Sequence, residues 1–202
     1  MSVVHVIDTL AEWAKQNICD KVLLKMPPAN TDPVDGEYDY ELVKPSVFPM
    51  YVPTSEKLPP NIHSPFPSLC VRFMKGADEI NKNSGYVDVQ FCFSAWDPGT
   101  HGKDVVHPNG DGTYSRKLDS SEYERNGNGW RDVWNFVDTA LRAVESVTSI
   151  GGYTIDRETL VEYGPLTEQE AIPDFYPFWF AWISFRINYP LRRNNVDFKK
   201  YL

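Results

Sequence analysis

Hydrophobic residues recur along this chain at two different spacings, and these spacings separate predicted helices from predicted strands. Apolar residues three and four positions apart predict one helix over 3–18 and a second over 130–147. Both segments leave charged side chains on the opposite face, so each helix is expected to cover a core with one side. Gly151 and Gly152 follow the second helix, as glycines commonly do at a helix C-terminus.

Other segments alternate apolar and polar residues, which is the period of a half-buried strand. This pattern predicts strands over 68–74, 86–96 and 175–190, and a strand or strand pair within 152–166. The polar stretch between the first two predicts a β-hairpin. The first half of 175–190 is apolar on both faces, so we expect it to be central or covered there.

These elements predict an α+β fold in one domain, residues 1–202. Consecutive strands joined by turns favour a two-layer antiparallel sheet of about four strands, with the two helices packed on one face. Three segments fall outside this layout. They are a Pro-rich extended arm at 26–67, a long polar loop at 97–128 and a C-terminal tail at 190–202.

The Pro-rich arm is the most unusual part of the composition. It holds ten of the 16 prolines, and proline favours extended backbone at its own position and at the one before it. Its aromatic side chains favour an arm that packs onto something, such as a neighbouring subunit. An arm folded back on its own domain fits the same pattern. The candidate contact residues in the arm are Tyr38, Tyr40, Phe48 and Tyr51.

Charge and cysteine content exclude some classes of protein. The 20 basic and 28 acidic residues give a net charge of −8, which argues against a broad phosphate-binding face. No apolar run approaches the roughly 18 residues of a membrane span, and the N-terminal segment lacks the basic start of a signal peptide, so we expect a soluble cytosolic product. The three cysteines have no CxxC spacing; Cys70 and Cys92 lie in alternating apolar runs and are interpreted as buried thiols.

Catalytic and metal-binding patterns match poorly. Motifs for a nucleophile elbow, a phosphate loop, a dinucleotide fold and a zinc protease are absent. The loop at 97–128 has a calcium-loop-like stretch, but Tyr114 stands where that motif needs glycine. The loop also holds histidines and aspartates, which we interpret as solvated rather than as metal ligands: His101, His107, Asp97, Asp104, Asp111 and Asp119. We therefore expect no enzymatic activity, no cofactor and no metal.

Three segments and their order resemble the tail-terminator, or tail-completion, proteins of long-tailed bacteriophages. The segments are 66–78, where FP precedes a strand and a glycine, the strand at 86–97, and the helix at 129–147. A closing strand, 173–189, completes the order. The resemblance covers the first predicted helix and residues 66–189.

The resemblance implies a non-enzymatic virion assembly protein located in the tail or neck of the particle and assembled in the host cytoplasm. Such subunits close into a ring, commonly a hexamer, that caps the tail tube and offers a surface for head–tail joining. The implied partners are further copies of the chain, the tail tube protein and the head–tail connector protein. DNA passes through the lumen without sequence-specific contacts. In the C-terminal segment of the chain, 190–202, Arg192 and Arg193 are candidate subunit contacts.

A binding module is the alternative function. In it, the aromatic strand and the polar loop would form a surface for a small ligand or a carbohydrate. An assembly protein should form closed rings, whereas a binding module should stay monomeric and expose an aromatic cluster. An enzyme should show a concave pocket with carboxyl groups of perturbed pKa.

Overall fold

The structure is a computed structural model, and it describes residues 3–28, 40–101, 105–111, 113–117, 123–124, 127–169 and 171–191. Its described helices are α1 (Val3–Asn17) and α2 (Trp130–Glu145). Its described strands are β1 (Leu24–Met26), β2 (Tyr40–Val43), β3 (Ser46–Pro49), β4 (Ser68–Glu79), β5 (Ser84–Trp96), β6 (Thr100–His101), β7 (Val105–Asn109), β8 (Thr113–Lys117), β9 (Tyr123–Glu124), β10 (Ser149–Ile150), β11 (Tyr153–Ile155), β12 (Glu162–Pro165) and β13 (Phe178–Pro190).

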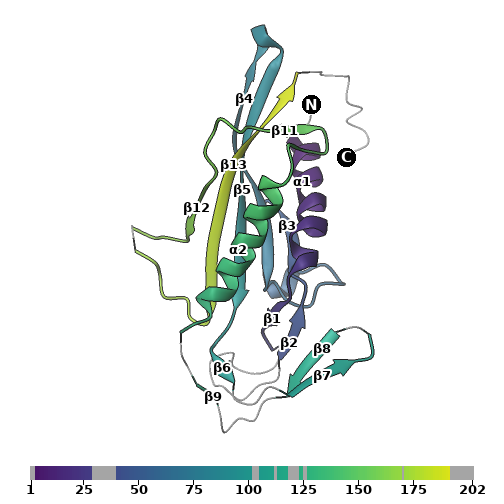
Figure 1. Cartoon of the computed structure of the whole chain (residues 1–202), viewed down its shortest axis with the longest axis vertical. Coiled ribbons are helices and arrows are strands. Elements are labelled where there is room, and N and C mark those ends of the chain that lie inside the picture. The colour runs from purple at the N-terminus through teal and green to yellow at the C-terminus, as the bar shows by residue number, and fades with distance from the viewer. Residues whose placement is uncertain are drawn as a thin grey trace.

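The main sheet is larger than the sequence pattern predicts. Its strand order is β10-β11-β13-β5-β4-β3 (Figure 1). β12 pairs with the same edge of β13 as β11 does, nearer to the start of β13. The predicted α+β class with two helices is confirmed, but the prediction of about four antiparallel strands is wrong. The main sheet has seven strands, and β3 runs parallel to β4. The strand pair predicted within 152–166 is present as β11 and β12. The strands that were not predicted, β3 and β10, have only four and two residues, too few to show a period of two.

The three longest strands are the frame on which the rest is built. β13 pairs with β5 along the full length of both strands, from the Phe178–Trp96 pair to the Pro190–Ser84 pair. β4 lies on the other side of β5 and forms the predicted hairpin with it. In Figure 1 this hairpin extends beyond the ends of the helices. Register shifts between Phe73 and Lys75, where a β-bulge interrupts β4.

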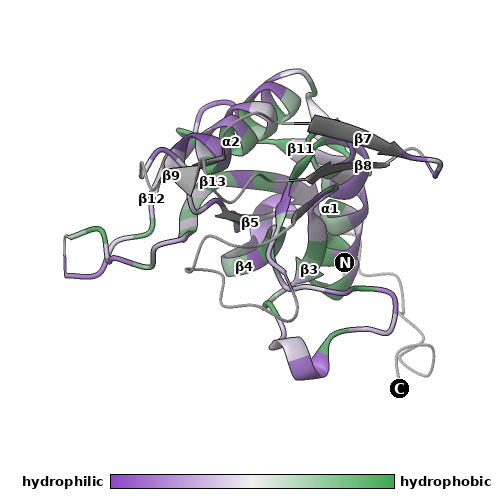
Figure 2. Ribbon diagram, turned by 90° about the horizontal axis from the view of Figure 1, so that it is seen from below, coloured by the Kyte–Doolittle hydropathy of each residue, from purple (hydrophilic) through white to green (hydrophobic). Residues whose placement is uncertain are grey.

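Both helices pack their apolar stripes against one face of these strands. Phe93 of β5 meets Phe136 of α2 edge to face, with ring centroids 4.9 Å apart. Figure 2 views the same packing from below, with apolar stretches in green. The sheet side of this core is made of alternate residues of the central strands: Val87, Val89, Phe91, Phe93, Ala95, Ala181, Ile183, Phe185 and Ile187. Alternation along each strand therefore separates the buried face from the other face, as the sequence pattern predicts.

Part of the Pro-rich segment folds back on its own domain. The ring of Phe66 lies 4.8 Å from that of Phe178 and 6.0 Å from that of Phe180, centroid to centroid. This contact covers the first half of β13 on the face away from the helices. Phe48 is buried in β3. The sequence is compatible with an arm that packs on a neighbouring subunit and with one that folds back on its own domain. This part of the arm folds back on its own domain.

The polar loop at 97–128 contains strands of its own. β7 and β8 form an antiparallel hairpin, and β8 joins β2 and β1 in a small second sheet. β6 pairs with β9. The turn of the β7–β8 hairpin includes Gly110 and Asp111, at the Asn-Gly-Asp-Gly sequence typical of tight turns.

The cysteines are buried or half-buried. Cys19 and Cys70 are buried, and burial raises the pKa of each thiol to about 12, so neither forms the reactive thiolate at neutral pH. Cys92 is half-buried and lies directly opposite Cys70 in the β4–β5 ladder. The buried-thiol interpretation is confirmed for Cys70. Neither described helix combines the length and hydropathy needed to cross a membrane.

The contact between Phe136 and the sheet gives a test of this core. Replacing Phe136 with Ala removes a fully buried ring at the helix–sheet interface and should lower the free energy of unfolding by about 3–5 kcal/mol. Urea unfolding followed by far-ultraviolet circular dichroism measures this. The control is Ile80→Ala at the hairpin end, where the side chain is 81% exposed and the change should stay within about 0.5 kcal/mol. Equal effects of the two substitutions would contradict the packing described here.

Candidate functional site

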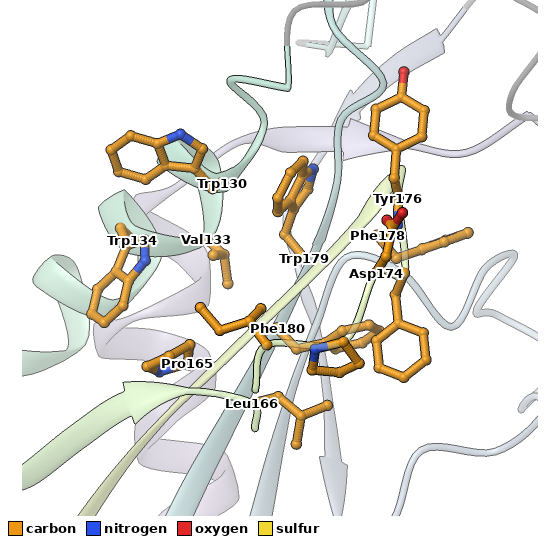
Figure 3. Close-up of a pocket in the computed structure, with 13 residues that line it drawn as sticks. Trp130, Val133, Trp134, Pro165, Leu166, Asp174, Tyr176, Phe178, Trp179 and Phe180 are labelled. Atoms are coloured by element: carbon orange, nitrogen blue, oxygen red, sulfur yellow. The ribbon is translucent and has the colours of Figure 1, made fainter. Parts of the chain in front are cut away.

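A groove lined by aromatic side chains lies where β13 begins. Its volume is about 400 Å³, within the usual range of small-molecule and peptide sites. Figure 3 shows Trp130 and Trp134 of α2 on one side of the groove and Trp179 of β13 beside them. Leu166, just after β12, and the connector that leads into β13 form the other side. Three segments distant in sequence thus contribute to one surface.

The floor of the groove is fixed by the turn that follows β5. Trp179 donates its indole N–H to the carbonyl oxygen of Asp97 at 3.0 Å. The hydroxyl of Tyr176 donates to the carbonyl oxygen of Pro98. The Asp97 carboxylate forms an ion pair with Lys25 at 2.6 Å, and both side chains are largely buried. Because these contacts use both the backbone and the side chain of Asp97, the floor is held in place before anything binds.

Gly129 makes the approach of α2 to this turn possible. A Cβ at this position would collide with the carbonyl oxygen of Asp97 and with the indole nitrogen of Trp179. Glycine at the N-terminal end of α2 therefore lets the helix begin directly against Asp97. This close approach brings Trp130 and Trp134 to the edge of the groove.

The rim of the groove leaves large apolar side chains in water. The exposed fractions of five of them lie between 42% and 69%. Trp130, Leu166, Ile172 and Phe175 line the groove, and Tyr163 lies beside it against Trp134. Contiguous exposed apolar surface of this kind typically marks a binding surface. Phe175 packs edge to face on Phe180, and Trp134 on Tyr163, so parts of the rim are ordered by ring contacts.

The chemistry of the groove suits an apolar or aromatic group that carries a positive charge beside it. Among the described lining residues, Asp174 carries the one charge, and its Oδ1 accepts the backbone N–H of Tyr176 at 3.1 Å. Tryptophan faces attract cations as well as apolar groups, and the guanidinium of Arg131 already lies 4.8 Å from the centroid of the Trp130 ring. The groove can therefore contact an apolar group through its rings and a cation through the carboxylate of Asp174.

The face of the sheet away from the helices becomes polar in its second half. Arg186 of β13 donates two hydrogen bonds to the carboxylate of Asp88 on β5, at 2.6 and 3.1 Å. The guanidinium carbon of Arg186 also lies 3.8 Å from the centroid of the Tyr86 ring. These hydrogen bonds hold the pKa of Asp88 below its ordinary value. The network joins the two central strands on their outer side.

The structure places the sequence-predicted contact residues in different environments. Tyr51 is 69% exposed and lies at the edge of a second, more open hollow that Arg72 and Trp182 also line. Phe48 is buried and has no exposed surface to offer a partner. Tyr40 begins β2, but its side chain lies outside the described atoms. The remaining three, Tyr38, Arg192 and Arg193, lie outside the described residues.

The interpretation of the loop aspartates as solvated is wrong for Asp97, which is 8% exposed and forms an ion pair with Lys25. Asp104 and Asp119 lie outside the described residues, as do the side chains of His101 and His107. Asp111 is fully exposed; the Thr113 hydroxyl and backbone N–H lower its pKa. In the part of the chain that the structure describes, no three His, Cys, Asp or Glu side chains gather as a metal site would require.

Sequence reasoning missed the groove because its residues come from separate elements. The helical spacing over 130–147 predicts Trp134 on the buried stripe and assigns no role to Trp130. The connector at 166–177 shows no periodicity. One signal was available: the aromatic residues of the last strand continue backwards through Tyr176 and Phe175, before the strand begins.

In comparisons with models of protein families, with curated proteins and with solved structures, nothing matches this chain.

The close approach at Gly129 can be tested by substitution. Gly129→Ala should lower the free energy of unfolding by about 1–3 kcal/mol, because the added methyl group forces Asp97 and Trp179 apart. Urea unfolding followed by circular dichroism and tryptophan fluorescence measures the loss. The matched control is Gly110→Ala, where a Cβ meets nothing within 4 Å and the change should stay within about 0.5 kcal/mol. A Gly129 variant as stable as the control would show that α2 can begin elsewhere.

The Asp88–Arg186 pair predicts a pH dependence. A carboxyl group whose pKa is lowered on folding stabilises the fold above its unfolded-state pKa, and this contribution is lost as the pH falls through the folded-state value. Asp88→Asn should therefore cost about 1–3 kcal/mol at pH 7 and progressively less below about pH 4. Parallel urea titrations of both chains across this range measure the difference. Asp138→Asn, on the exposed side of α2, is the control. A cost independent of pH would mean that the charge of Asp88 contributes nothing.

Proposed function

We propose that this chain is a virion assembly protein of the tail-terminator type. Copies of it join head to tail into a closed ring that caps the tail tube and presents a head–tail joining surface. The observation that carries the proposal is the aromatic groove at the start of β13, whose rim leaves five large apolar side chains in water. The resemblance of the sequence to that family, together with the α+β class and two helices, gives the groove its proposed role.

Exposed apolar surface favours association. Removing it from water stabilises a complex by roughly 25 cal/mol per Å² of apolar area, before the costs of ordering the partners. Trp130 and Phe175 are both more than 40% exposed, and aromatic side chains dominate interface energies when a partner covers them. The fixed floor at Asp97 reduces the cost of ordering the site on binding.

The two ends of the long sheet differ in chemistry, which favours head-to-tail contacts. The groove lies at the beginning of β13. At the opposite end, the β4–β5 hairpin carries charged residues: Lys75, Asp78, Glu79 and Lys82. A surface that meets a different surface of the next copy gives a ring when the rotation closes. The net charge of −8 suits a ring through which DNA slides without binding.

Binding of a small ligand or carbohydrate is the second candidate function. It is favoured by the size of the groove and by its aromatic walls, on which a sugar ring can stack. In this case Trp134 and Trp179 would contact the ligand, and the chain would stay monomeric. The two candidates differ in oligomeric state, so one set of measurements separates them.

The assembly proposal predicts a particle of defined mass. Six copies of the 23.2 kDa chain give about 139 kDa, and negative-stain images of the purified chain should show closed rings. Ile172→Asp places a charge on a 69% exposed position of the rim and should raise the dissociation constant for self-association at least about tenfold. Sedimentation equilibrium measures both the mass and the constant.

The matched control is Leu160→Asp, which makes the same kind of change at a 79% exposed position that does not line the groove. It should associate like the unaltered chain. A monomer at every concentration tested, combined with saturable binding of an oligosaccharide that quenches tryptophan fluorescence, would favour the second candidate instead. Failure of the ring-forming chain to restore head–tail joining in a phage extract would contradict the terminator role.

A further inference from the structure

The sequence that leads into β13 and the sequence that follows it carry opposite charges. Between Arg157 and Arg186 there are five acidic residues and not one Lys or Arg. The acids are Glu158, Glu162, Glu168, Glu170 and Asp174. Glu162 and Glu168 flank the groove-lining residues Pro165 and Leu166, and Asp174 lines the groove itself. The connector side of the groove is therefore acidic in sequence, whereas on the α2 side the guanidinium of Arg131 lies 4.8 Å from the centroid of the Trp130 ring.

The segment at 192–202 has the complementary composition. It holds four basic residues and one acid, and its basic residues are Arg192, Arg193, Lys199 and Lys200. Phe198 stands directly before the two lysines, and Tyr201 directly after them. An aromatic ring with an adjacent cation is the chemistry that aromatic walls beside carboxylates recognise. Both the charge and the apolar groups of this segment match the groove.

Geometry excludes the groove of the same copy for Phe198. The backbone N–H of Leu191 donates to the carbonyl oxygen of Asn83 at 3.0 Å, which fixes the start of the segment beside the β4–β5 hairpin. From Phe178 to Pro190, β13 runs twelve steps of about 3.3 Å, roughly 40 Å, away from the groove (Figure 1). Phe198 follows Leu191 by seven residues and reaches at most about 25 Å from it. A groove that binds Phe198 must therefore belong to another copy.

We propose that residues 192–202 of one copy bind in the aromatic groove of the next copy. The ring of Phe198 contacts the tryptophans of the groove, and Lys199 and Lys200 pair with the carboxylates of its rim. The inference rests on the proposed function, because it names the segment that links neighbouring copies in the ring. It also accounts for the head-to-tail direction, since the segment starts at one end of the sheet and the groove lies at the other.

A charge exchange in the full-length chain tests this contact. Lys199→Glu with Lys200→Glu should raise the dissociation constant for self-association at least about tenfold, and so should Glu162→Lys with Glu168→Lys. The chain with all four substitutions should return to within about threefold of the unaltered chain, because the pairs are restored with opposite sign. Sedimentation equilibrium measures the constants, and circular dichroism checks that each variant is folded. Asp138→Lys with Glu145→Lys, on the exposed side of α2, is the control and should change nothing.

The outcomes separate this inference from the proposed function. If the Lys199→Glu, Lys200→Glu chain forms rings with the constant of the unaltered chain, the segment is not the link, and the ring proposal stands on its own. If both pairs of substitutions weaken association but the combined chain is not restored, the groove and the segment do not contact each other, and the inference is overturned. If the unaltered chain does not associate, both the ring and this link are wrong.

Discussion

The antiparallel pairing of β5 with β13 is the constraint on which the rest of the structure depends. Each strand has 13 residues, and their register is continuous from end to end. Because side chains alternate across a strand, one register decides both faces at once. It gives the helices a continuous apolar surface on one side, and on the other side it sets Arg186 opposite Asp88. A slip of one residue would bury that ion pair and expose the core.

At the groove end, the β5–β13 pairing is continued by the contacts of Asp97, the residue after β5. β5 ends at Trp96, so Asp97 is the first residue free to turn, and its backbone N–H still bonds to the carbonyl oxygen of Pro177 at the start of β13. Lys25 neutralises its buried carboxylate, and a buried charge without a partner would be costly. Trp179 and α2 then pack against a backbone that these contacts hold in place. The groove is held by these contacts where it meets the core, and most of its exposed apolar groups lie on the connector before β13, with Trp130 on α2.

Periodicity predicted the elements that are long enough to show it. Both helices and the three long strands follow from spacings of 3.6 and 2 residues, and the coverage of Phe178 and Phe180 by Phe66 agrees with the all-apolar first half of β13. The short strand β3 and the pairing of β12 depend on contacts between distant segments, which no local pattern contains. Phe48 illustrates the difficulty, because an aromatic residue in a Pro-rich stretch fits an exposed arm and a buried strand equally well. The groove escaped prediction because residues around 130, 166 and 176 meet only after folding.

The aromatic groove has two parts: Val133, Trp134 and Trp179 belong to the core or pack against it, whereas the side chains at the rim are left largely in water. Core residues of the described fold reach nearly complete burial, as Phe93 and Phe136 do. Trp130 and Ile172 nevertheless remain in water, although the buried Val133 lies within one helix turn of Trp130. Folding alone gives no reason to expose such side chains, because polar residues at these positions would make the protein more soluble. The cost of their exposure is recovered when another surface covers them. In the assembly proposed above, Asp174 and the acidic connector beside this apolar groove favour a covering surface that carries positive charge.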